Sequence, residues 1–114
     1  MKIDKLFKNA SVYNVYTEKW QKNIDVAVLE GRILYTGNSS LYEFQADEII
    51  QCEGKPLIPG MIDIHLHIES TLCTPVTFGT SVLRRGVTTI VSEPHEIANV
   101  FGVEGIREMI RVSE

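Results

Sequence analysis

Residues 60–70, GMIDIHLHIES, alternate polar and apolar side chains, and this pattern constrains the fold more than any other part of the chain. The polar parity holds Asp63, His65, His67 and Glu69, and the apolar parity holds Ile62, Ile64, Leu66 and Ile68. Successive side chains of a β-strand point to opposite faces, so the two histidines should share one face with their Cβ atoms about 7 Å apart. We expect the apolar face to pack against helices.

The residues after this strand predict alternating helices and strands. The expected elements are a helix that starts at Thr74-Pro75 and is closed by Gly86, a strand at 87–92, a polar loop at 93–102 and a helix from about Val103. This order is typical of a parallel α/β sheet or barrel. Two βα units cannot close a barrel that needs eight, so we expect a truncated, unclosed barrel.

The residues before the alternating strand predict a β-rich region. Expected strands lie at 10–17, at 23–37 with a tight turn at Glu30-Gly31, and within 44–54. No helical period of useful length precedes residue 70. We therefore expect two domains: a β-sandwich or meander over residues 1–56, and the start of the α/β domain over residues 57–114.

Composition narrows the class of partner. The chain is 44% hydrophobic and 23% charged with a net charge of −4, which indicates an ordinary globular protein without a basic surface for nucleic acid or anionic membrane. No signal peptide or membrane span is apparent. We expect a cytoplasmic protein with a small-molecule substrate, in which Cys52 and Cys73 are reduced packing residues.

The polar face of the alternating strand suits a metal ion. His65 and His67 can converge on one cation, since neutral imidazole binds zinc, iron and manganese, and Asp63 can orient a ligand histidine from behind. Residues at the C-terminal end of a barrel strand face the active-site mouth. The alternative is a half-exposed strand whose histidines are merely solvated.

A second polar cluster, SEPHEIANV at residues 92–100, follows the second strand and should open onto the same mouth. It contains Glu93, His95, Glu96 and Asn99. Either His95 or a neighbouring carboxylate contacts substrate or metal, or the segment is a polar loop in which Asn99 or Glu96 caps the next helix.

The quoted residues resemble a known family. PLIPGMIDIHLHIES is similar to the first barrel strand of the amidohydrolase superfamily, and the β-rich segment resembles its companion β-sandwich. HIESTLCTPVTF and EPHEIANVFGVEGI resemble the adenine deaminase branch. The resemblance implies a mixed fold: N-terminal β-sandwich strands plus the first βα units of a metal-dependent-hydrolase TIM barrel.

The resemblance also implies a chemistry. His65 and His67 would bind one or two divalent ions, with manganese or iron expected and zinc as an alternative, and Asp63 would support them. The activated water would attack C6 of adenine and give hypoxanthine and ammonia, with a carboxylate carrying the proton. His95 and Glu96 would contact substrate or transfer protons. The resemblance implies Asp where Glu93 stands, which leaves its role open.

Glu69 bears on the substrate. Some relatives carry Arg at this position, where it can bind a substrate carboxylate. An anion cannot do so, but it can accept hydrogen bonds from the N–H groups of a purine or amidine. Adenine, a purine that is neutral or weakly basic, fits such an acceptor.

Other interpretations stay open. The later ligands of the family are absent, so we expect this chain alone to be inactive, and an exposed apolar sheet edge favours a homo-oligomer. The chain could instead derive from another amidohydrolase, such as a deacetylase or imidazolone hydrolase. It could also be a non-catalytic β-rich protein that serves binding or oligomerisation.

Overall fold

The computed structural model describes residues 1–113 and divides the chain into two compact units, with the division between Pro59 and Gly60. This division falls three residues after the domain boundary predicted at residue 56. The assignment of the units to a sandwich component and to the start of a barrel domain stays a prediction. Each unit is described by itself below.

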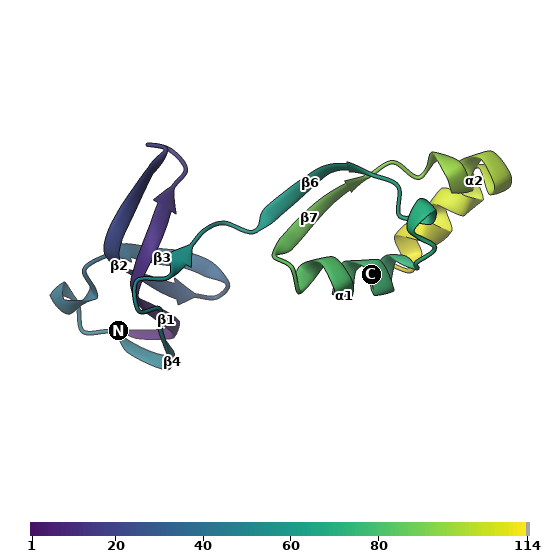
Figure 1. Ribbon diagram of the computed structural model, residues 1–114. Coiled ribbons are helices and arrows are strands. Elements are labelled where there is room, and N and C mark those ends of the chain that lie inside the picture. Colours follow the sequence, from purple (N-terminus) through teal and green to yellow (C-terminus); the bar gives the residue numbers. More distant parts are fainter. Residues whose placement is uncertain (114) are drawn as a thin grey trace. The chain divides into compact units, whose positions relative to one another are not determined.

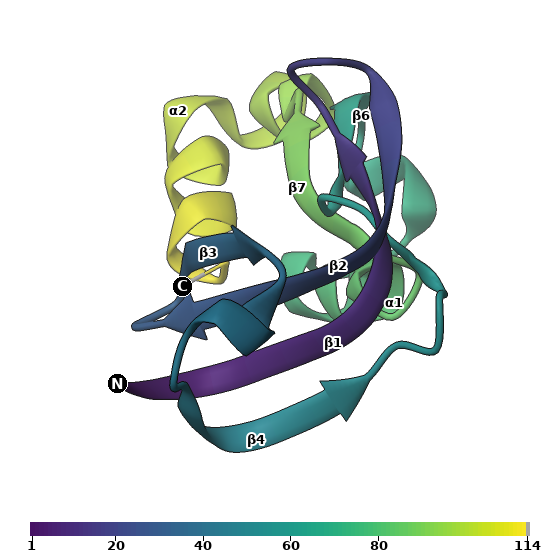
Figure 2. The same cartoon turned by 90° about the vertical axis from the view of Figure 1, so that its left-hand side faces the viewer.

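The first unit is one mixed sheet (Figure 1). The strand order is β3-β2-β1-β4, with β5 also paired to β1. Pairs β1–β2 and β2–β3 are antiparallel, whereas β4 and β5 run parallel to β1, and Figure 2 shows β1 between β2 and β4. Its elements are β1 (Lys2–Asn14), β2 (Lys19–Leu29), β3 (Arg32–Gly37), the 3₁₀ helix η1 (Ser39–Leu41), β4 (Gln45–Gln51) and β5 (Pro56–Leu57).

Strand β1 begins at Lys2, so the prediction of a strand from residue 10 was wrong at this end. Two register shifts against β2 flank Ala10, and Asn9 adopts a left-handed φ of 55°. The buried residues Ile3, Leu6 and Ala10 are three and four positions apart, so burial does not recur every second position. This spacing hides the alternation by which a strand is recognised in sequence. The predicted turn at Glu30-Gly31 is confirmed, with φ of 51° and 71°.

A buried carboxylate in this sheet accepts hydrogen bonds from two separate segments of the first unit. Asp25 of β2, only 8% exposed, accepts hydrogen bonds from the backbone N–H of Asn9 (2.7 Å) and from the N–H (3.1 Å) and Oγ (2.5 Å) of Ser39. Burial by itself would raise the pKa of Asp25. The three hydrogen bonds and the nearby Lys8 outweigh burial and hold the pKa below its usual range.

We predict that Asp25→Asn lowers the free energy of unfolding by about 1–3 kcal/mol at pH 7, because the amide NH₂ would face a donor. The pKa of folded Asp25 is depressed, so its stabilisation is present above the unfolded pKa of about 4 and is lost as pH falls through the folded value. Urea unfolding at pH 7 and below pH 4 should show the difference between the two proteins shrinking. A constant difference would contradict this.

The second unit contains the predicted strand–helix–strand–helix order (Figure 1). Its elements are β6 (Met61–Leu66), the 3₁₀ helix η2 (Glu69–Thr71), α1 (Pro75–Leu83), β7 (Val87–Ser92) and α2 (His95–Arg111). Strands β6 and β7 are parallel, and β7 has the predicted bounds. Thr74 caps α1 as predicted, since its side chain accepts a hydrogen bond from the N–H of Thr77 (3.3 Å). Among residues 1–113, no helix is long and apolar enough to cross a membrane.

Strand β6 does not keep its alternation as far as Glu69. It ends at Leu66. Between the pairs Asp63–Ile90 and Leu66–Ser92, β6 advances by three residues and β7 by two, so the register of the two strands shifts there. The predicted packing of the apolar parity holds for Ile68, which is 5% exposed, but was wrong for Ile62 and Ile64, which are 60% and 77% exposed. These two side chains are thus left largely uncovered by the described part of the chain.

Helix α2 starts at His95, so the prediction of a loop over 93–102 was wrong for most of its length. Gly102, with φ 61° and ψ −149°, breaks the helical conformation, and a second segment continues from Val103 as predicted. Gly105 is buried in the second segment. A Cβ there would lie 3.0 Å from the carbonyl oxygen of Ile97, so the two segments pack closely beyond the kink.

Gly102 and Gly79 form a matched pair for testing the kink. No described atom lies within 4 Å of a Cβ built at either position, so steric contact does not decide the outcome. We predict that Gly102→Ala destabilises the protein by about 1–3 kcal/mol because its backbone conformation suits glycine alone. Gly79→Ala, inside α1, should stabilise it by about 0.5–1 kcal/mol. Thermal unfolding that moves both variants in the same direction would contradict the kink assignment.

Candidate metal centre

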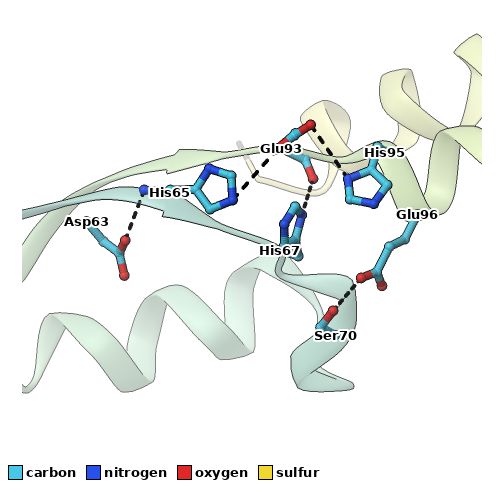
Figure 3. Close-up of polar contacts among 7 residues, drawn as sticks. All are labelled: Asp63, His65, His67, Ser70, Glu93, His95 and Glu96. Carbon is cyan, nitrogen blue, oxygen red and sulfur yellow. Dashed lines mark hydrogen bonds and ion pairs between the residues drawn. The ribbon is translucent and has the colours of Figure 1, made fainter.

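Parallel pairing brings the ends of β6 and β7 to one edge of the second unit. Leu66 lies opposite Ser92, and the next residue, Glu93, donates its N–H to the carbonyl oxygen of Leu66 (3.0 Å). His65 is the penultimate residue of β6, and His67 follows its last residue, Leu66. His95 begins α2 three positions after the end of β7. The two histidine-bearing segments predicted from sequence therefore meet, as Figure 3 shows.

The three imidazoles form a contiguous row. The ring centroids of His65 and His67 are 5.0 Å apart, and those of His67 and His95 are 4.6 Å apart. Both pairs are edge-to-face, with interplanar angles of 89° and 85°. The side chains of His65 and His95 are exposed and His67 is half-buried, so ring nitrogens remain open to a ligand.

Glu93 contacts all three histidines. Its backbone oxygen lies 2.8 Å from Nδ1 of His67, and its carboxylate oxygens lie 3.9 Å from Nε2 of His65 and 3.7 Å from Nδ1 of His95. A carbonyl oxygen only accepts, so Nδ1 of His67 donates and Nε2 is left free for a metal. The sequence placed Glu93 in the cluster and left its role open. Every residue has a backbone oxygen, so the type of residue at position 93 does not indicate this contact with His67.

Two overlapping groups could hold a metal ion. One contains His65, His67 and Glu93, and the other contains His67, His95 and Glu96. Within each group the ligand atoms lie within 4.8 Å of one another. Ligands of a tetrahedral ion at 2.0–2.1 Å are about 3.4 Å apart, so small side-chain rotations suffice and the residues fit a divalent ion. His67 belongs to both groups, and its single free nitrogen serves one ion at a time.

Asp63 supports the backbone. Its Oδ1 accepts a hydrogen bond from the backbone N–H of His65 (3.2 Å), and in Figure 3 its carboxylate points away from the imidazoles. The contact lies where the register of β6 shifts against β7. Asp63 therefore holds the strand next to a ligand, and its carboxylate does not contact an imidazole.

Glu69 and Ser70 of η2 contact the first turn of α2. Oε1 of Glu69 accepts a hydrogen bond from the N–H of Ile97 (3.2 Å), and the hydroxyl of Ser70 donates to Oε1 of Glu96. The second oxygen of Glu69, Oε2, is buried and has no hydrogen-bond partner among residues 1–113. Pro94 occupies the N-cap position, so the interpretation of Asn99 or Glu96 as the helix cap was wrong.

Comparisons with known proteins show the family of the chain. The family model described as the amidohydrolase family matches residues 57–114. Adenine deaminase 2 of Shouchella clausii is 55% identical over 99% of this chain and 20% of its own length. Adenine deaminase of Bacillus subtilis is 43% identical over 96% of this chain and 18% of its own length. The chain thus spans about a fifth of the length of the curated relatives it matches.

A solved structure shows which fold the chain is similar to. The D-aminoacylase variant in complex with CuCl₂ superposes with a TM-score of 0.66 at 28% identity, over 80% of this chain and 18% of that one. The predicted fold class is confirmed at the level of an amidohydrolase-type fold: a mixed sheet precedes the first βα units, and the described residues form no closed barrel.

The two overlapping groups predict unequal effects of removing each histidine. His67→Ala disrupts both groups, whereas His65→Ala and His95→Ala each leave one group complete. We predict that His67→Ala weakens divalent-metal binding by more than about 100-fold and the other two by about 10-fold each. Calorimetric titration of the purified metal-free protein with Mn²⁺ or Zn²⁺ measures this. Glu104→Gln is the control, because Glu104 is exposed on α2 and its ion pair among residues 1–113 is with Arg107, away from the histidines. Equal losses for His65→Ala and His67→Ala would contradict the shared ligand.

Proposed function

The chain belongs to the amidohydrolase family, and on that premise we propose that it forms the N-terminal portion of a metal-dependent adenine deaminase. The proposed reaction converts adenine and water to hypoxanthine and ammonia. The observation that carries the proposal is the convergence of three histidines and Glu93 at the ends of β6 and β7, in a chain 55% identical to an adenine deaminase.

The proposed cofactor is a divalent ion held by His65 and His67 together with Glu93. Once bound, such an ion lowers the pKa of a water molecule and so supplies a nucleophile at neutral pH. Imidazole and carboxylate ligands suit manganese, iron and zinc, and we propose manganese or iron. The D-aminoacylase neighbour, described in complex with CuCl₂, supports a divalent ion as the cofactor.

The other roles in the proposed reaction are assigned to residues near the proposed ion. The carbonyl oxygen of Glu93 fixes the tautomer of His67, which leaves Nε2 free and would allow it to bind the ion. His95 and Glu96 stand next to His67 and are proposed to contact the substrate or to carry the proton between water and the leaving amine. Oε1 of Glu69 already accepts a hydrogen bond from α2, so a direct substrate contact would depend on Oε2.

A second candidate function is hydrolysis of an N-acyl group. It is favoured by the structural similarity to D-aminoacylase, at a TM-score of 0.66 and 28% identity. The same metal site could activate water for either reaction, because both begin with attack on an electrophilic carbon. The difference in sequence identity, 55% against 28%, supports the deaminase as the first choice. For either enzyme we propose a cytoplasmic homo-oligomer with a small-molecule substrate.

Ammonia release from adenine tests the proposal. The full-length protein, loaded with Mn²⁺, should produce hypoxanthine and ammonia in equal amounts, measured by absorbance and by a coupled ammonia assay. His65→Ala and His67→Ala should each lower kcat/KM by more than about 100-fold, since each removes a ligand. Glu104→Gln should match the wild type. Turnover of an acylated amino acid in place of adenine would favour the second candidate, and a protein that binds no metal would contradict both.

A further inference from the structure

We propose that Glu69 is a positioning residue, whose carboxylate holds the start of α2 so that His95 and Glu96 lie beside His67. This inference rests on the proposed metal-dependent function and assigns Glu69 a role different from direct substrate recognition. It is carried by four observations: the hydrogen bond from Ile97, the lack of a local cap on α2, the second link through Ser70 and the anchored conformation of η2.

The start of α2 has no cap of its own. The first N–H groups of a helix have no partner within the helix and need an acceptor from elsewhere. The N-cap residue is Pro94, which offers no side-chain hydrogen bond. Oε1 of Glu69 supplies the acceptor to Ile97 from 28 positions earlier in the chain, and its negative charge also suits the positive end of the helix dipole.

The segment that carries Glu69 is itself fixed. Ile68 is buried, and its carbonyl oxygen accepts hydrogen bonds from the N–H (3.0 Å) and Oγ1 (2.6 Å) of Thr71. Glu69 accepts a further backbone bond from Leu72 (3.0 Å). His67 immediately precedes this anchored turn. The hydrogen bond that Glu69 accepts from Ile97 therefore holds the start of α2 in a fixed position relative to the end of β6.

The two links act on adjacent residues. Glu69 binds the backbone of Ile97, and Ser70 donates to the carboxylate of Glu96. Between them they restrain the first turn of α2, which begins with His95. This restraint supports the 4.6 Å separation of the His67 and His95 rings, to which their edge-to-face contact and the contacts of Glu93 also contribute.

Two substitutions separate the parts of this interaction. Glu69→Gln keeps the length of the side chain and a carbonyl oxygen that can accept from Ile97, but removes the charge. Glu69→Asp keeps the charge, but its side chain is one methylene shorter. Its carboxylate therefore cannot reach the nitrogen of Ile97, which lies 3.2 Å from Oε1 of Glu69. If the hydrogen bond positions α2, Gln should rescue and Asp should not. If Glu69 instead accepts substrate N–H groups through Oε2, Gln should fail because its NH₂ group cannot accept.

The test uses the full-length protein and two measurements made without adenine. In Glu69→Asp, we expect amide hydrogen exchange over residues 95–99 to accelerate about 10-fold and the Kd for Mn²⁺ to rise about 10-fold, as for other residues that orient ligands. Glu69→Gln should stay within about 3-fold of the wild type in both. Glu104→Gln is the matched control on the same helix, and thermal unfolding reports any general loss of stability.

Kinetics with adenine complete the test. We expect Glu69→Gln to leave KM near the wild-type value and Glu69→Asp to lower kcat at saturating Mn²⁺. The proposal is overturned if Glu69→Asp exchanges and binds Mn²⁺ like the wild type, or if Glu69→Gln raises KM about 10-fold with unchanged metal affinity. A wild-type protein that binds Mn²⁺ without deaminating adenine would refute the proposed function, while the exchange and metal measurements would still decide the role of Glu69.

Discussion

The parallel pairing of β6 with β7 is the constraint on which the candidate site depends. Parallel neighbours need a crossover connection, and α1 supplies it between the two strands. Their carboxyl ends consequently lie at the same edge, which brings His67 and Glu93 into hydrogen-bond contact although 26 positions separate them. An antiparallel pairing would place the end of one strand beside the start of the other and separate the histidines.

Close packing at the other end of this strand pair supports the pairing. A Cβ built at Gly60 would lie 2.1–2.7 Å from side-chain atoms of Thr88. Thr88 stands where β7 has an extra residue relative to β6. A glycine is therefore required for the chain to enter β6 beside this bulge, and the Pro-Gly step before the histidine strand has a steric reason within the second unit.

The sequence predicted the elements whose signals are local. The cap at Thr74, the bounds of β7 and the turn at Glu30-Gly31 each depend on residues adjacent in the chain. The two histidines of β6 and the polar cluster after β7 were also identified from residue types and spacing, and the structure brings them together. Their assignment as ligands stays a prediction.

The elements that the sequence did not predict depend on distant partners. In β1, a register shift lies beside Asn9, whose N–H donates to the carboxylate of Asp25, 16 positions away. The start of α2 lacks a local signal because its acceptor, Glu69, lies 28 positions away. The contact of Glu93 with His67 is made by a backbone oxygen, which every residue has. In each case the missing information is a long-range hydrogen bond.

The two units also differ in what fixes their geometry. The first has a hydrophobic cluster of Ile3, Leu6 and Ala27, whereas Ile68 is the one buried large apolar side chain in the described part of the second. Apolar packing is non-directional, so it resists separation of elements more than it specifies the angle of one side chain. Hydrogen bonds from Glu93, Glu69 and Ser70 are directional. The geometry of the histidine cluster therefore depends mainly on these polar contacts, and small changes in side-chain length at Glu69 should matter more for the site than for the stability of the fold.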